Sequence, residues 1–150
     1  MKIPYFEQET KYTCGPAVMR MALTVLGIKK SEKQLVKLLR TNKVIGTWVK
    51  NLPRVAEKYK LTYLVARGAS IEDLKQLIKW KYVVIICYYY QPGKVSHFSI
   101  VHKVDSKYIY LLDHWNGPDH KYSISYFSKV WKKVYEGTRP EKGWLFAVKK

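Results

Sequence analysis

The chain has 150 residues, enough for one domain that buries roughly two-thirds of its unfolded surface. Its hydrophobic content of 47% and aromatic content of 15% exclude an intrinsically disordered protein. No apolar run approaches the roughly 20 residues of a membrane-spanning helix, and the N-terminus lacks a secretory apolar region. We therefore expect a single domain over residues 1–150, either cytoplasmic or exported by a signal that has been removed.

The net charge is +17, from 28 Lys and Arg against 11 Asp and Glu. Such an excess favours acidic partners, anionic membrane surfaces or nucleic acid. The lysines are scattered along the chain, however, and no block of five like charges occurs. A solvated lysine-rich surface is therefore the simpler interpretation, with weak electrostatic binding to acidic partners as the alternative.

The first half of the sequence has mainly helical patterns. Apolar residues at helical spacing predict a helix over 14–26. A capping-box pattern from Ser31 to Gln34 predicts a second helix that ends near Arg40. A third helix follows the turn at Gly46-Thr47, and Pro53 should kink it or delay its start.

The second half is typical of an antiparallel sheet. A weak strand over 61–66 and a short capped helix from 70 precede it. The predicted strands are 82–90, 97–104, 108–113 and 144–148, with a turn-rich loop over 113–120 and a helix near 126–131. Helices first and strands second predict an α+β domain.

The stretch from Gln8 to Ala17 has the features of a nucleophile site. Cys14 lies at or beside the start of the first helix, with Thr13 as a potential N-cap and Pro16 in the first turn. The positive end of a helix favours the thiolate, which is the reactive form of cysteine. Gln8 lies six residues upstream, where its amide could donate to an oxyanion. Cys87 lies within an apolar run and is expected to pack in a strand without a disulfide to Cys14.

These residues resemble the papain-like cysteine peptidases, and within them the bacteriocin-processing (double-glycine) peptidases and their stand-alone relatives. The matching pieces are Gln8, Cys14 in Cys-Gly-Pro-Ala, His97 in Ser-His-Phe-Ser, and Asp113 in Tyr-Leu-Leu-Asp. The family often has Pro directly after the Asp, whereas His114 follows it here. Asn116 and Asp119 therefore stay open as alternatives to Asp113.

The resemblance implies a papain-like fold in which N-terminal helices pack on a C-terminal antiparallel sheet. It also implies a thiol peptidase that acts on a peptide or protein substrate without a cofactor or metal. Cys14 would form the acyl-enzyme, His97 would act as base and acid, Asp113 would orient His97, and Gln8 would donate to the oxyanion. His102 should point to the opposite sheet face from His97, and His114 and His120 should lie solvated in the loop.

Two other functions remain open from the sequence. The same chemistry can transfer the acyl group to an amine or thiol acceptor, as in phytochelatin-synthase-like relatives. Alternatively, the domain could be a basic non-catalytic binding module on the same scaffold.

Overall fold

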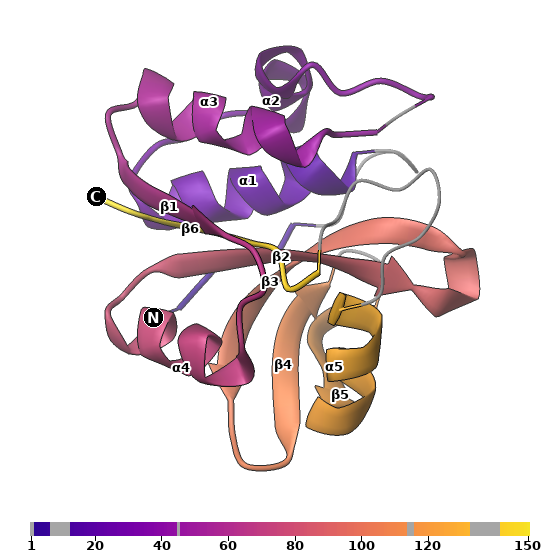
Figure 1. Ribbon diagram of the computed structural model, residues 1–150. Helices are drawn as coiled ribbons and strands as arrows, with labels where there is room; N and C mark the ends of the chain where they lie inside the picture. The colour runs from indigo at the N-terminus through magenta and orange to yellow at the C-terminus, as the bar shows by residue number, and fades with distance from the viewer. Residues whose placement is uncertain (1, 7–12, 45, 114–115, 133–141) are drawn as a thin grey trace.

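The computed structural model describes residues 2–6, 13–44, 46–113, 116–132 and 142–150 (Figure 1). The helices are α1 (Cys14–Val25), α2 (Glu32–Leu39), α3 (Leu52–Lys58), α4 (Ile71–Lys79) and α5 (Ile124–Lys132), with short 3₁₀ turns η1 (Val49–Asn51) and η2 (Gln91–Gly93). The strands are β1 (Thr62–Ala66), β2 (Val83–Tyr90), β3 (Val95–Val104), β4 (Tyr108–Asp113), β5 (Gly117–Ser123) and β6 (Leu145–Lys149).

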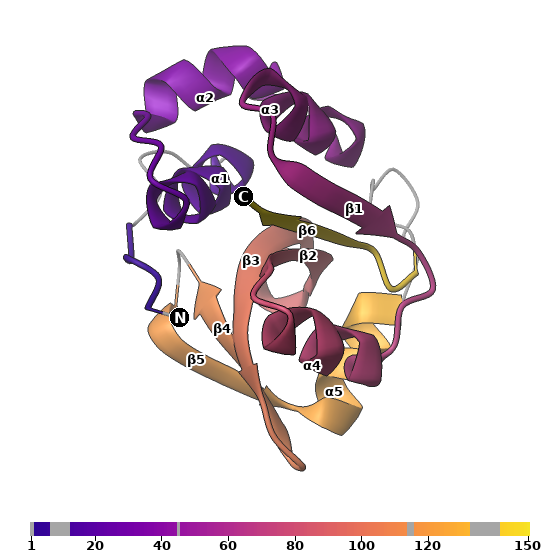
Figure 2. The ribbon, with the colours of Figure 1, turned by 90° about the vertical axis from the view of Figure 1, so that its left-hand side faces the viewer.

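The six strands form one antiparallel sheet in the order β1-β6-β2-β3-β4-β5. Helices α1, α2 and α3 cover one face, and α4 and α5 cover the other (Figure 2). The predicted α+β class with N-terminal helices on an antiparallel sheet is confirmed. The structure adds two features: β1, from the first half of the chain, joins the sheet beside β6, and helices occupy both faces.

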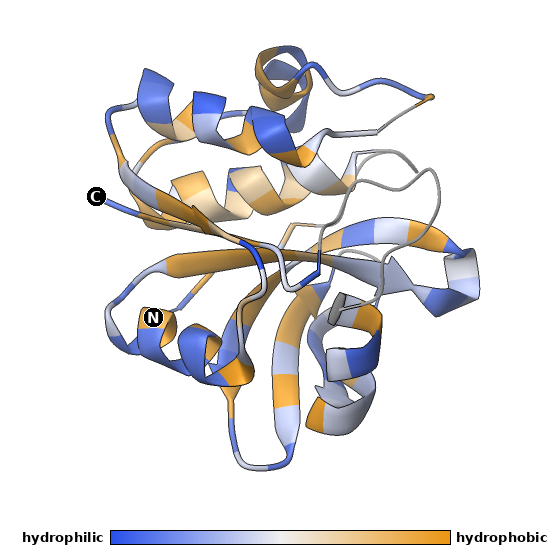
Figure 3. Ribbon diagram, viewed as in Figure 1, coloured by the Kyte–Doolittle hydropathy of each residue, from blue (hydrophilic) through white to orange (hydrophobic). Residues whose placement is uncertain are grey.

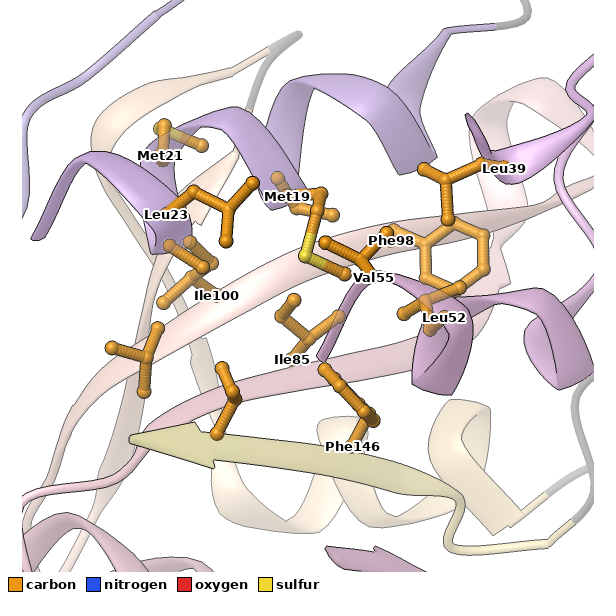
Figure 4. Packing of buried hydrophobic residues seen from close by; sticks show 14 of the residues in the cluster. Met19, Met21, Leu23, Leu39, Leu52, Val55, Ile85, Phe98, Ile100 and Phe146 are labelled. Atoms are coloured by element: carbon orange, nitrogen blue, oxygen red, sulfur yellow. The ribbon is translucent and has the colours of Figure 1, made fainter. Parts of the chain in front are cut away.

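The larger apolar core lies between α1 and the sheet. Figure 4 shows Met19 and Leu23 of α1 packed toward Ile85, Ile100 and Phe146, all of which are at most 1% exposed. Hydrophobic colours therefore run along α1 and the middle strands, whereas α2 and α3 carry hydrophilic residues outward (Figure 3). Because the apolar face of α1 packs on the sheet, the position of its first residue, Cys14, is fixed relative to the strands.

A second core lies on the opposite face, beneath α4 and α5. Phe127 and Trp131 of α5 stack with ring centroids 5.3 Å apart, and both are buried. The Trp131 indole Nε1–H donates to the Trp144 carbonyl oxygen at 2.8 Å, so the buried indole has a partner. Because helices pack on both faces of the sheet, the middle strands β2 and β3 are largely buried on both sides. This agrees with the continuous apolar sequence of β2.

The local sequence signals account for most helix starts. Ser31 and Ser70 each form both hydrogen bonds of a capping box, as the sequence predicted. Pro53 lies in the first turn of α3, directly after the 3₁₀ turn, so this helix begins late rather than kinking.

The predicted loop over 113–120 is wrong in its second half, because strand β5 begins at Gly117. The turn formers concealed an alternating pattern in which Asp119 and Lys121 are exposed while His120 and Tyr122 are half-buried. Pro118 is tolerated because β5 is an edge strand, where one backbone N–H can be missing. A shift in register between Leu111 and Asp113 accompanies this turn.

Truncation of the α1 core should destabilise the fold strongly. Leu23→Ala removes fully buried methyl groups and should lower the free energy of unfolding by about 2–5 kcal/mol in urea denaturation. Val44→Ala is the matched control, since Val44 is 92% exposed and should change stability by no more than about 0.5 kcal/mol. Equal losses in the two variants would contradict this packing.

Candidate active site

Cys14 is the first residue of α1, at the helix end that carries positive partial charge. Thr13 occupies the N-cap position, and its carbonyl accepts from the Ala17 N–H at 3.0 Å, but its side chain makes no capping hydrogen bond. Cys14 is buried, with 9% of its surface exposed. The sequence prediction of a cysteine at a helix start is confirmed.

Gly15 lets another segment approach this helix start closely. A Cβ atom at Gly15 would lie 2.6 Å from Cβ of Thr47, a distance that real side chains do not tolerate. The Thr47 hydroxyl is in turn hydrogen-bonded to that of Thr41 at 2.6 Å, and both threonines are buried. The Gly after Cys14 is thus required by the loop that leads into η1.

His97 and Asp113 meet on the sheet although they come from different strands. His97 lies in β3 and Asp113 ends β4, and their Nε2 and Oδ2 atoms are 3.0 Å apart. Both side chains are fully buried. With Nε2 directed at Asp113, the second ring nitrogen, Nδ1, is the one available to the Cys14 thiol.

Asp113 is surrounded by donors. Its Oδ2 accepts from the hydroxyls of Tyr88 and Ser99, each at 2.9 Å, in addition to His97. Its Oδ1 accepts from the backbone N–H and the side-chain amide of Asn116, each at 3.0 Å. Five donors on one buried carboxylate favour its ionised form and fix its orientation.

The pKa of the His97 imidazole depends on its two neighbours, Asp113 and Cys14. Burial would lower the pKa of the imidazole, but hydrogen bonds with Asp113 and with the Cys14 side chain, together with their charges, raise it to about 9. The imidazolium form of His97 is therefore favoured at neutral pH. A protonated imidazole beside a thiol at a helix start is the environment that activates cysteine.

Cys87 shares this region without the same activation. Burial raises the pKa of the Cys87 thiol well above its ordinary value, the nearby Cys14 raises it further, and a hydrogen bond from the His97 backbone lowers it only in part. Both cysteines are free thiols, so the expectation of no disulfide is confirmed. Cys87 packs in β2 as the sequence predicted.

The structure distinguishes among the other predicted site residues. Asn116 contacts Asp113 rather than His97, and Asp119 is exposed on β5, where it acts on the pKa of His102. Gln8 and His114 lie outside the described residues. Of the three candidate orienters, the described contacts bring only Asp113 to His97.

The remaining histidines differ from one another. His102 lies near Tyr110, with ring centroids 6.3 Å apart, on the sheet face opposite to His97, as predicted. The expectation that His120 lies solvated in a loop is wrong: it is half-buried in β5, 4.5 Å from the Tyr122 ring. Burial lowers the pKa of both imidazoles, so neither carries a charge at neutral pH.

Sequence reasoning missed Tyr88, Ser99 and Thr47. A usable signal existed for Ser99, which lies two residues after His97 and so shares its sheet face. Tyr88 pairs directly with His97 across β2 and β3, but this register is set by the β2–β3 turn and was not readable from composition.

Within the described residues, no cluster of three or more metal-ligating side chains occurs, and no helix is long and apolar enough to cross a membrane.

The chain belongs to the Peptidase C39 family, which it matches over residues 2–141. It is 31% identical over 108 residues to an uncharacterized protein of Methanothermobacter marburgensis, a match that covers 71% of this chain and 68% of the relative. A second uncharacterized protein, from Methanothermobacter thermautotrophicus, is 30% identical over 106 residues, covering 71% and 68% of the two chains.

Solved structures share the fold at low sequence identity. One from Bacillus anthracis, described as a C39-like peptidase, has a TM-score of 0.76 at 16% identity and covers 99% of this chain and 95% of its own. The peptidase domain of Streptococcus ComA, a bi-functional ABC transporter, has a TM-score of 0.74 at 18% identity and covers 99% of this chain and 100% of its own. A double glycine motif protease from an AMS/PCAT transporter, in complex with the leader peptide, has a TM-score of 0.72 at 19% identity and covers 99% of this chain and 93% of its own. The fold is therefore that of papain-like C39 peptidase domains.

Adding a methyl group at Gly15 should disturb the helix start. Gly15→Ala should destabilise the protein by about 1–3 kcal/mol in urea denaturation, because Thr47 must move away. The double variant Gly15→Ala/Thr47→Gly removes the overlapping atoms and should regain stability relative to Gly15→Ala. Wild-type stability in Gly15→Ala would show that Thr47 does not lie against α1.

The raised pKa of His97 predicts how stability depends on pH. Protonated His97 is favoured in the folded state, so its contribution is complete below the ordinary pKa of 6.5 and is lost as pH rises through about 9. The unfolding free energy of the wild type minus that of His97→Gln should therefore fall between about pH 6 and about pH 10. A difference that stays constant or grows with pH would contradict the assignment.

Proposed function

We propose that this protein is a thiol-dependent peptidase whose single domain spans residues 1–150. One observation carries the proposal: the His97 Nε2 atom lies 3.0 Å from Asp113 Oδ2, a hydrogen bond with the Cys14 side chain raises the pKa of the same imidazole, and all three side chains are buried. Membership of the Peptidase C39 family supports the same reaction class. A peptide substrate fits this class, as in the solved relative bound to a leader peptide.

The proposed reaction proceeds through an acyl-enzyme. The Cys14 thiolate attacks the peptide carbonyl, and the His97 imidazolium protonates the leaving amine. Water then attacks the thioester while His97 accepts its proton, which releases the acid product and restores the thiol. Asp113 keeps the imidazole oriented and stabilises its positive charge in both steps.

The backbone N–H of Cys14 and the side-chain amide of Gln8 are the proposed oxyanion donors. The described N-terminal segment supports this role for Gln8, because one of its side chains is anchored at Asp113 and the next one packs on α1. The Tyr5 hydroxyl donates to the Asp113 carbonyl at 3.0 Å, and the Arg20 guanidinium lies 3.9 Å from the centre of the Phe6 ring. Loss of one such donor typically costs about 3 kcal/mol of transition-state stabilisation.

The two thiols should differ in reactivity. Brief treatment with iodoacetamide at about pH 6, followed by mass mapping, should label Cys14, because His97 and the helix start favour its thiolate. Cys87 should stay unlabelled until the protein unfolds, since burial keeps it a neutral thiol. Preferential labelling of Cys87 in the folded protein would remove Cys14 as nucleophile.

Substitutions should separate the roles of the acidic residues. Cys14→Ala and His97→Ala should abolish peptide hydrolysis, and Asp113→Ala should lower kcat by on the order of tenfold or more with little change in KM. Asp119→Ala is the matched control and should behave like the wild type, since Asp119 is exposed. A silent Asp113→Ala combined with an inactive Asp119→Ala would overturn the assignment.

Analysis of the products tests the reaction class itself. With a peptide substrate and added amine or thiol acceptors, mass spectrometry should find the free acid as the main product. A main product joined to the acceptor would instead identify an acyl transferase. No product of either kind, with the fold intact, would favour a non-catalytic binding module.

A further inference from the structure

The oxygen of Asp113 that faces His97 is shared among three donors. Its Oδ2 lies 3.0 Å from His97 Nε2 and 2.9 Å from each of the hydroxyl oxygens of Tyr88 and Ser99. Asn116 takes the other oxygen with two hydrogen bonds. The two hydroxyls therefore compete with the imidazole for the same carboxylate oxygen.

The sheet register explains why these hydroxyls lie there. Tyr88 pairs directly with His97 across β2 and β3, so the two side chains share one face of the sheet. Ser99 lies two residues further along β3 and shares that face as well. Tyr88 is 1% exposed and Ser99 is fully buried, so each hydroxyl needs a protein partner and finds it in Asp113.

We propose that Tyr88 is a positioning residue of the active site. Its hydroxyl, with that of Ser99, holds Asp113 Oδ2 in place and limits how tightly this carboxylate binds the proton of His97. This inference rests on the proposed function only for its catalytic meaning. The hydrogen bonds that carry it hold whether or not the protein cleaves peptides.

The direction of the effect follows from the charges. A hydroxyl that donates to Oδ2 places the positive end of its dipole at that oxygen. It therefore reduces the negative charge that Asp113 presents to the His97 imidazolium. Removing that hydroxyl leaves more of the carboxylate charge to His97, so the imidazolium becomes more stable. A general acid works best when its pKa lies near the working pH, so Tyr88 keeps His97 able to release its proton to the leaving group.

Other groups around His97 do not mask this effect. The titratable side chains that face it or act on it are Cys14 from α1, Cys87, Tyr88 and Tyr90 from β2, Asp113 from β4 and His120 from β5. Burial raises the pKa of the Cys87 thiol and of the Tyr88 hydroxyl well above their ordinary values, so both stay neutral near neutral pH. Burial lowers the pKa of His120, which is neutral there too.

The packing around Tyr88 allows its hydroxyl to be removed without removing its ring. The ring lies 5.9 Å from those of Phe127 and Tyr122 and 5.8 Å from that of His97, contacts that phenylalanine can keep. Tyr88→Phe therefore deletes one donor to Asp113 and a hydrogen bond with the Tyr122 hydroxyl, whose own pKa is raised to about 12 by burial so that it stays neutral, and it leaves the aromatic packing in place.

The test is an NMR titration of the His97 imidazole, assigned by its absence from the spectrum of His97→Gln. Tyr88→Phe should raise the pKa of His97 by on the order of half a unit, and Ser99→Ala should shift it in the same direction. Tyr126→Phe is the matched control, since its hydroxyl contacts Gln91 at 3.1 Å and lies outside the Asp113 network. It should leave His97 unchanged.

The direction separates positioning from a merely structural role. A variant that loosened the fold would admit water and return the pKa of His97 toward 6.5, the opposite of the predicted rise. An unchanged or lowered pKa in Tyr88→Phe overturns the proposal, whatever Ser99→Ala does. The titration needs no substrate, so failure to cleave peptides or to alkylate Cys14 would defeat the proposed function and leave this result standing.

Discussion

The buried carboxylate of Asp113 is the group on which the rest of the site depends. A charge removed from water is stable in a protein only if hydrogen bonds replace its hydration. Asp113 receives such bonds from β2, β3 and the residues that follow β4, and its backbone carbonyl accepts a further one from Tyr5. The carboxylate thus joins three strands at the point where His97 must be held, and the backbone of the same residue ties the N-terminal segment to them.

The helical layer supplies the other half of the site. Helix α1 packs on the sheet through an apolar face, and the Cys14 side chain at its start is close enough to His97 to raise the pKa of the imidazole. Gly15 then leaves room for Thr47, so the loop before η1 closes over the helix start. Apolar packing sets the distance between the two layers, while hydrogen bonds within the sheet set the orientation of the imidazole.

Much of this arrangement was predictable because it depends on short-range patterns. The helix after Cys14, the capping boxes at Ser31 and Ser70, and the apolar strand that ends at Tyr90 each carry their signal in adjacent residues. The family resemblance then indicated that Cys14, His97 and Asp113 should meet.

The rest depends on register and on contacts between distant segments. The turn formers near Gly117 concealed strand β5, whose half-buried positions become visible only when β4 lies beside it. The partners of Asp113 were unreadable for the same reason, since Tyr88 reaches it only through the pairing of β2 with β3. Gly15 showed no sign of its role, because the residue that requires it, Thr47, comes from a separate loop.

We propose that Cys14 is a thiolate nucleophile paired with a His97 imidazolium that Asp113 orients. Ultraviolet absorbance of the thiolate in the folded protein, with Cys14→Ser as the reference, tests it most directly. We expect thiolate absorbance in the wild type that is missing from Cys14→Ser and reduced in His97→Gln. Absorbance that persists in Cys14→Ser, or that is the same with and without His97, would contradict this pairing.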